Sequence, residues 1–257
     1  DIELVDIALS YYFDPVYFSL FLDIAVKNKN LEIVKRLLSI PGINPNLLNE
    51  EGYTSISIAI KTFNYDIIVA FLDFYEKEIQ YQIPQVDIIL YVLMGKILPK
   101  NEIHFLNVIK RFINIVKNAD LNFYLDGKTF LIEAVRKNNS ELVQLLLDSD
   151  KFDVNNWDLS DNSTPLIISI LNKNPIIAKQ LINYPKTNIN FVNQDFKTTL
   201  DIAIEMKQIE IIELLIKCER FDPVINRIDR VFYDSDDEVS QLLYQIKELD
   251  VNYSFYG

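Results

Sequence analysis

The sequence predicts an all-α solenoid, in which pairs of short helices repeat along the chain and each pair packs on the next. One observation is a segment around a threonine that recurs at intervals of 75, 35 and 34 residues, at Thr54, Thr129, Thr164 and Thr198. Another is a run of apolar residues at helical spacing, with an acidic residue in its first turn, which starts twelve residues after three of these threonines. A period in the middle thirties with two helices per unit is typical of stacked repeats.

The threonine segments resemble the ankyrin repeat, whose family pattern runs Asp-Gly-x-Thr-Pro-Leu-His-x-Ala. They span residues 51–59, 126–134, 161–169 and 195–203, and the family's leucine follows the threonine in the last three. The resemblance implies a hairpin tip, a first helix, a tight turn, a second helix and an extended link in each unit. Another α-solenoid with helix pairs of similar length is the alternative, and the threonine pattern argues against it. The bias towards Ile, Asn and Lys is similar to that of divergent repeats from AT-rich unicellular eukaryotes.

Two departures from the family pattern affect hydrogen bonding. The family histidine is replaced by Ser57, Ile132, Ile167 and Asp201, so its hydrogen bond to the threonine is expected to be absent or differently made. The glycine between the two helices is replaced by asparagine or by a longer residue. Asparagine is the best substitute where the backbone is left-handed.

The elements are expected in a regular order. Residues 2–9 carry the second-helix pattern, so the chain is expected to open inside a repeat, and the next repeat has helices near 18–27 and 31–39. The following repeat has a second helix that extends through Glu76 to Gln80. Because 75 residues separate Thr54 from Thr129, a degenerate repeat with helices near 85–95 and 102–117 lies between them.

Past Phe221 the pattern decays, and Ser235-Asp236-Asp237-Glu238 fits a capping box that opens a final helix. Stacked repeats bury their apolar faces against neighbours, so a single domain with one continuous core is expected. The expected boundaries are a half repeat at 1–16, repeats at about 17–51, 52–83, 84–125, 126–160, 161–194 and 195–229, and a C-terminal cap at 230–257.

Charge and composition limit the partners. The net charge of −12 argues against nucleic acid and against an anionic membrane surface, and it is compatible with a basic protein partner. The longest apolar stretch, residues 86–98, is too short to insert in a membrane. The single cysteine, Cys218, forms no disulfide within the chain, so a reducing, cytoplasmic location is expected.

The residues that carry catalysis are scarce. Five glycines are too few for a dinucleotide cradle, and Gly127-Lys128-Thr129 lacks the upstream glycine of a phosphate-binding loop. His104 is the single histidine and Cys218 the single cysteine, so zinc sites of the Cys/His kind cannot be assembled. Acidic residues gather in the links without the spacing of a calcium loop, which favours a solvated edge. We therefore expect a non-catalytic protein with no cofactor and no metal.

The resemblance to ankyrin repeats implies that hairpin tips and the concave face of the first helices bind a protein partner. Trp157 is the single tryptophan, and aromatic anchors are enriched at interfaces, although packing against a neighbouring link is an equal alternative. The candidate contact residues are Glu50, Glu51, Tyr53, Tyr124, Asp126, Lys128, Trp157, Asp158, Ser160, Asp161, Ser163, Gln194, Asp195 and Lys197. A scaffold or adaptor is the predicted function. The alternatives are a fixed part of a larger cytoskeletal or organellar assembly, and the repeat arm of a longer enzyme.

Overall fold

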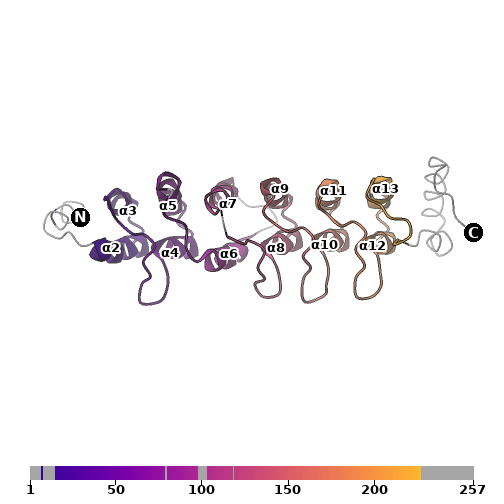
Figure 1. Cartoon of the computed structure of the whole chain (residues 1–257), viewed down its shortest axis with the longest axis horizontal. Helices are drawn as coiled ribbons and strands as arrows, with labels where there is room; N and C mark the ends of the chain where they lie inside the picture. The colour runs from indigo at the N-terminus through magenta and orange to yellow at the C-terminus, as the bar shows by residue number, and fades with distance from the viewer. Residues whose placement is uncertain (1–6, 8–14, 79, 98–102, 118, 227–257) are drawn as a thin grey trace, which may run out of the picture. The chain divides into compact units, whose positions relative to one another are not determined.

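The chain is an all-α repeat solenoid in the computed structural model, which describes residues 7, 15–78, 80–97, 103–117 and 119–226 (Figure 1). Those residues contain twelve helices and two isolated β-bridges, and they form no strand. The chain divides into two compact units, one of residues 1–96 and 101–123, the other of residues 97–100 and 124–257. The expected half repeat at 1–16 falls almost wholly outside the described residues, and the C-terminal cap falls entirely outside them.

The first unit holds three helix pairs. First helices contact first helices, since α4 touches both α2 and α6, and second helices contact second helices, since α5 touches both α3 and α7. The pairs are α2 (Pro15–Lys27) with α3 (Leu31–Leu38), α4 (Ser55–Lys61) with α5 (Tyr65–Lys77), and α6 (Val86–Met94) with α7 (Ile103–Ile115). The helices predicted near 18–27, 31–39, 85–95 and 102–117 are thus confirmed within a few residues.

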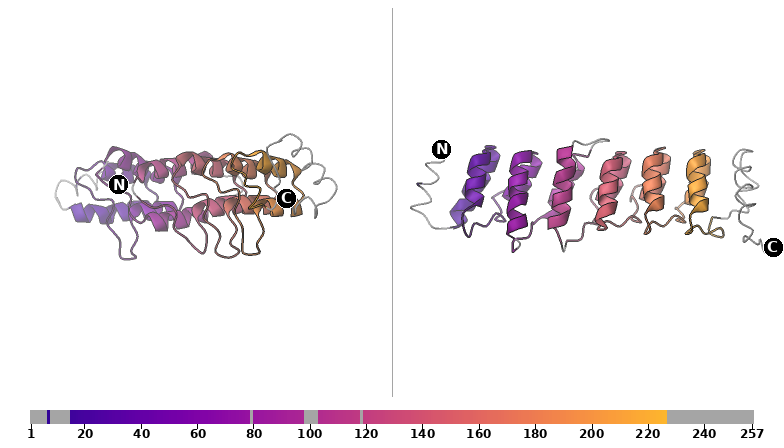
Figure 2. Two further views of the ribbon diagram at one scale, coloured as in Figure 1. Left: turned by 45° about the vertical axis from the view of Figure 1, so that its right-hand side comes forward. Right: turned by 90° about the horizontal axis from the view of Figure 1, so that it is seen from above.

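The second unit repeats this arrangement. Its helices α8, α10 and α12 form one layer and α9, α11 and α13 the other, with a loop before each first helix on the same side of this unit (Figures 1 and 2). The pairs are α8 (Phe130–Arg136) with α9 (Ser140–Ser149), α10 (Pro165–Leu171) with α11 (Pro175–Asn183), and α12 (Thr199–Glu205) with α13 (Ile209–Lys217).

One predicted helix end is wrong. Helix α5 ends at Lys77 rather than at Gln80, and Glu78 has already left the helical region, with φ −95° and ψ 67°. Phe74 and Tyr75 are the last buried residues of the helix, whereas Glu76, Lys77 and Glu78 are exposed. A further helical turn would bury no apolar surface, so packing would not stabilise it and the helix ends.

The recurring threonine starts each of the four regular first helices. The side-chain oxygens of Thr54, Thr129, Thr164 and Thr198 accept a hydrogen bond from the backbone N–H three residues on. This bond satisfies a donor that the helix leaves without an intrahelical partner, and such a cap contributes about 1 kcal/mol. An asparagine does the same for four second helices, at Asn30, Asn64, Asn139 and Asn174.

The hydrogen bond of the family histidine is made differently in two repeats. Ser57 Oγ lies 2.8 Å from Thr54 Oγ1, and Thr198 Oγ1 donates to Asp201 Oδ2 over 3.0 Å. Asp201 also accepts from the backbone N–H of Thr198, which completes a capping box. Ile132 and Ile167 have no polar atom for this role, so the prediction that the bond is absent or altered is confirmed.

The tight turn between the helices is left-handed at one residue in each regular repeat. Lys29, Phe63, Asn138, Lys173 and Lys207 have φ between 48° and 57° there. Asparagine takes this position only at Asn138 among them, and a longer side chain takes it in the others. A residue with a Cβ is strained in this region, so these turns slightly lower the stability of most repeats.

The core consists mainly of the first helices and the inner faces of the second helices. Every residue of α10 from Pro165 to Ile170 is buried, because α8 and α12 contact it from both sides. The second helices carry their buried residues on one side only, as in α13 at Ile211, Ile212, Leu215 and Ile216.

The links of neighbouring repeats are joined by asparagines. Asn155 Nδ2 donates to the Lys186 carbonyl over 2.8 Å, and its Oδ1 accepts from the backbone N–H of Asn188 over 2.7 Å. Asn190 repeats this with the Arg220 carbonyl and the Asp222 N–H, at 2.7 and 3.0 Å. In the sequence these asparagines follow Val154 and Ile189. Each fixes the position of the following link, and with it the base of the following hairpin.

Candidate partner-binding surface

Each regular first helix is preceded by a hairpin tip, which we name after the helix. The α4 hairpin (residues 49–53), the α8 hairpin (125–128), the α10 hairpin (158–163) and the α12 hairpin (193–197) are each closed by a backbone hydrogen bond between their end residues. The α8 hairpin is the shortest. Asp126 and Gly127 both have positive φ, 49° and 79°, as a type I′ turn requires.

An asparagine side chain holds the α4 and α12 hairpins from within. Asn193 Oδ1 accepts from the backbone N–H groups of Asp195 and Lys197, at 3.0 and 2.9 Å. Asn49 does the same for Glu51 and Tyr53, at 3.0 Å each. Such local bonds fix a turn without help from the rest of the chain.

The α10 hairpin is held instead by a buried carboxylate. Asp158 is fully buried, and its Oδ2 accepts from Arg136 Nε of α8 over 2.5 Å. Its Oδ1 accepts from the backbone N–H and the hydroxyl of Ser160, at 2.9 and 2.6 Å. Arg136 also reaches Asp161, with Nη2 to Oδ2 at 2.6 Å. Burial alone raises the pKa of a carboxyl group, but these hydrogen bonds and the arginine charge outweigh it and hold the pKa of Asp158 below its ordinary value.

The structure places the predicted contact residues in three environments. Trp157 is 42% exposed, whereas Asp158 and Ser163 lie inside the α10 hairpin. The prediction of partner contact therefore now rests on the other twelve. Those that are exposed are Glu50, Glu51, Asp126, Trp157, Ser160, Asp161, Gln194 and Asp195, and those that are half-buried are Tyr53, Tyr124, Lys128 and Lys197.

Tyr124 and Trp157 come from neighbouring hairpin arms of the second unit and meet. The phenol of Tyr124 forms a hydrogen bond with the backbone of Trp157. Burial of Tyr124 raises its pKa, and the charges of Asp153 and Asp158 raise it further. Trp157 is 42% exposed, so other residues cover part of it, and its contact with a partner stays a prediction.

Sequence reasoning placed Leu159 at a hairpin tip but missed two other apolar residues there, Val192 and Phe196. Leu159, Val192 and Phe196 are 56%, 41% and 77% exposed. Leu159 lies on the α8 hairpin, since its N–H donates to the Gly127 carbonyl over 2.9 Å. Phe196 stands where the family pattern has glycine. The sequence contained this signal, because Asp195-Phe196-Lys197-Thr198 aligns with Asp126-Gly127-Lys128-Thr129.

In the first unit the polar tip residues have partners within the chain. Glu51 Oε1 lies 3.7 Å from Lys27 Nζ, and the ammonium of Lys61 lies 4.9 Å from the centre of the Tyr53 ring. Gln85 donates to the Gly52 carbonyl over 2.7 Å. This glutamine belongs to the degenerate repeat, and it ties the α4 hairpin to that repeat.

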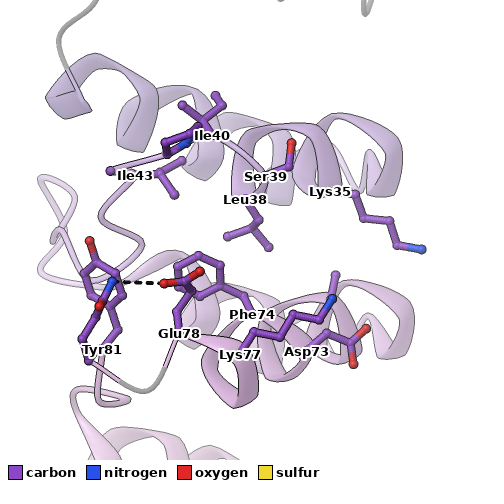
Figure 3. Close-up of a pocket in the computed structure, with 14 residues that line it drawn as sticks. Lys35, Leu38, Ser39, Ile40, Ile43, Asp73, Phe74, Lys77, Glu78 and Tyr81 are labelled. Atoms are coloured by element: carbon purple, nitrogen blue, oxygen red, sulfur yellow. Dashed lines mark hydrogen bonds between the residues drawn. The ribbon is translucent and has the colours of Figure 1, made fainter.

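The first unit also contains a groove of about 700 Å³ between the end of α3 with its following link and the second half of α5. Figure 3 shows Leu38, Ile43 and Phe74 around it, with Glu78 held by the Gln80 amide at 3.0 Å. The hydroxyl of Ser39, which lines the groove, donates to the Arg36 carbonyl over 2.6 Å. The groove therefore offers apolar surface and charges of both signs.

The single histidine lies in α7 and the single cysteine follows the last residue of α13. The His104 ring lies 4.4 Å from the ring of Tyr65, and Cys218 is the half-buried residue that ends α13. Among the described residues no group of three or more His, Cys, Asp or Glu side chains could hold a metal ion. None of the helices described there is both long and apolar enough to cross a membrane.

Paired helices, hairpin tips and threonine caps define a repeat of the ankyrin class, and comparison with known proteins agrees. Residues 131–227 match the family model of ankyrin repeats in three copies. Residues 131–227 are therefore ankyrin repeats. No curated protein matches it significantly by sequence.

Solved structures share the fold at low sequence identity. The ankyrin repeat domain of Bcl-3, a member of the IκB family, is 17% identical, with 88% of this chain and 97% of that chain covered and a TM-score of 0.57. An ankyrin repeat domain from Acinetobacter baumannii is 22% identical, with 75% and 94% covered and a TM-score of 0.56. A chain in the complex of a predatory endopeptidase from Bdellovibrio bacteriovorus with an immunity protein is 21% identical, with 75% and 95% covered and a TM-score of 0.51.

Proposed function

We propose that this chain is a non-catalytic scaffold or adaptor that binds a protein partner through its hairpin tips and the adjoining face of its first helices. Ankyrin repeats are in general modules of protein–protein interaction. The observation that carries the proposal is the exposure of large apolar side chains on tips whose backbones are fixed by local hydrogen bonds. Rigid loops bind at a lower entropic cost than flexible ones.

The partner carries a basic surface in this proposal. Asp126 and Asp195 are exposed at the tips of the second unit, and Lys197, which lies between Asp195 and α12 in the sequence, is paired with Glu205 at 2.7 Å. Charge complementarity of this kind raises the association rate and makes it depend on salt.

The test is affinity purification from the native cell followed by mass spectrometry, with three forms of the protein. The wild type is compared with Trp157→Ala/Asp195→Lys and with the control Asn183→Lys at the exposed end of α11. We use Asp195 rather than Asp161, because a lysine at Asp161 would repel Arg136 and disturb the α10 hairpin. The same protein should be captured by the wild type and by the control and be lost with the double variant. A partner that is retained by the tip variant and lost with the helix variant would overturn the proposal.

A further inference from the structure

Phe196 combines two unfavourable features at one position. Its φ of 60° lies in the left-handed region, where Gly52, Gly127 and Asn162 stand in the other hairpins. For a bulky residue this backbone conformation is an outlier. Its ring is also 77% exposed, so the side chain gains little from burial within the chain. A strained backbone under a largely exposed aromatic side chain motivates a hypothesis of function.

The strain is maintained by the hairpin around it. The N–H of Phe196 donates to the Asn193 carbonyl over 3.1 Å, and the Asn193 side chain binds the N–H groups on either side of Phe196. Val192 and Thr198 form a bridge at the base of the same hairpin. The ring is therefore presented in a fixed position.

Other exposed apolar residues lie on the same side of the second unit. Trp157, Leu159 and Val192 are between 41% and 56% exposed, and they belong to the loops before α10 and α12, which lie side by side in both figures (Figures 1 and 2). The helices that follow these loops contact each other. We call Trp157, Leu159, Val192 and Phe196 the tip patch. Aromatic side chains held rigidly are the usual anchors of an interface.

The charges beside the tip patch select one kind of partner. The exposed acidic residues there are Asp126 and Asp195, together with Asp161, which is paired with Arg136. The described part of the second unit, residues 124–226, contains fifteen acidic and eleven basic residues. An anionic membrane surface is repelled by such a field, whereas Lys and Arg side chains are attracted.

We propose that the tip patch binds a protein segment whose aliphatic or aromatic side chains are flanked by Lys or Arg, with Phe196 as its anchor. This rests on the function proposed above and adds the position of the contact and the chemistry of the partner. The hairpin keeps a strained phenylalanine because the ring is buried when that segment binds.

A phage-displayed library of random twelve-residue peptides tests this on the 257-residue chain. The affinity of selected synthetic peptides is measured for the wild type, for Phe196→Gly and for the control Ile176→Ala, whose side chain is 59% exposed on α11. Trp157 is the single tryptophan, so its emission reports directly on binding at the tip patch.

The expected peptides have an apolar centre and basic flanks, and they shift the Trp157 emission to shorter wavelength. Phe196→Gly should weaken them by roughly tenfold while it raises the melting temperature, because glycine relieves the backbone strain. Ile176→Ala should leave their affinity unchanged. A higher melting temperature together with weaker peptide binding shows that Phe196 serves binding rather than stability.

Three outcomes overturn the proposal. Selected peptides with acidic flanks would do so, as would affinities that do not respond to Phe196→Gly, or a Trp157 shift with phosphatidylcholine vesicles in place of peptides. Peptides that bind but depend on tip residues outside the patch would leave the scaffold function standing and remove the tip patch from it. A chain that selects no peptide at all would remove both.

Discussion

At the scale of single residues, the left-handed positions show how far these repeats have departed from the family pattern. Family repeats use glycine between the two helices, and Lys173 stands there in this chain with φ 53°. Its side chain is exposed, so the residue gains little from burial to offset the strained backbone.

Lys173→Gly should therefore raise the free energy of unfolding by about 1 kcal/mol. Lys137 is the matched control, because it caps the end of α8 with φ −79° and its backbone is not strained. Glycine at this position adds backbone entropy to the unfolded chain and removes a weak surface ion pair with Glu133. Lys137→Gly should be neutral or destabilising. Urea denaturation of the two variants measures the difference, and equal effects would mean that the turn is not strained.

The threonine segments predict where the first helices lie, and the structure adds that all four threonines cap these helices. Phe196 shows the reverse case. Exposure and φ depend on the shape of the whole hairpin, so the alignment shows that Phe196 replaces the family glycine but not that its side chain is exposed.

At the scale of elements, the hairpins differ in what holds them. The α12 hairpin is closed by its own asparagine, whereas the α10 hairpin depends on Arg136 from α8, a helix of the preceding repeat. This dependence was hidden in the sequence. Asp158 and Arg136 are 22 residues apart in the sequence. A sequence also looks the same whether an aspartate in a polar loop is buried, as Asp158 is, or exposed to solvent.

Asp158→Asn should lower the free energy of unfolding by roughly 2–3 kcal/mol at neutral pH, because it leaves Arg136 without its buried partner. The pKa of Asp158 is lowered in the folded protein, so its contribution is fully present above the unfolded value of about 3.9 and is lost as the pH falls through the folded value. The difference between wild type and variant should thus be constant from pH 7 to about 5 and shrink below about 4.

Asp195→Asn is the control for this experiment, since Asp195 is exposed at the next hairpin. It should change stability by less than about 0.5 kcal/mol at any pH. A pH dependence of the same size in both variants would contradict the assignment to Asp158.

The link asparagines give a second prediction at this scale. Asn190→Ala removes a donor to the Arg220 carbonyl and an acceptor for the Asp222 N–H, and should cost about 1–3 kcal/mol. Hydrogen exchange should rise first in residues 218–226. Asn188→Ala is the control, because within the described residues its side chain accepts a hydrogen bond only from the neighbouring Asn190 N–H. Faster exchange throughout α8 and α9 instead would mean that the asparagine acts on the whole unit.

At the scale of the whole molecule, stability is distributed by position along the stack. Helix α10 contacts a first helix on each side, and Ile168 in it is 1% exposed. Ile202 is the equivalent residue of α12, four positions after its threonine, and is 4% exposed. Repeat proteins couple neighbour to neighbour, so the same change should spread differently from these two places.

Ile168→Ala and Ile202→Ala should each cost about 2–4 kcal/mol. Ile168→Ala should raise hydrogen exchange in both α8 and α12, whereas Ile202→Ala should raise it in α10 and α13 and leave α8 less affected. Identical exchange maps for the two variants would show that the second unit unfolds as one block rather than repeat by repeat.

The sequence period predicted the helices of both units, because burial at a fixed spacing is a local property of the chain. The division into two units was not predicted, since it depends on how many contacts cross from one repeat to the next around residues 97–124. That interval is the degenerate repeat, where the threonine cap and the hairpin pattern are both missing from the sequence.

Because two of the hairpins are closed by their own residues, their loops can change in sequence during evolution without affecting the rest of the fold. The α4 and α12 hairpins take their bonds from their own asparagines, and the helix behind each starts on its own threonine. Substitutions between this asparagine and this threonine change the surface of the loop without disturbing the helices. The α10 hairpin lacks this freedom, since Asp158 ties it to Arg136. New binding preferences should therefore accumulate fastest in the loops that hold themselves together, and a designer who wishes to redirect this protein should begin with residues 194–196.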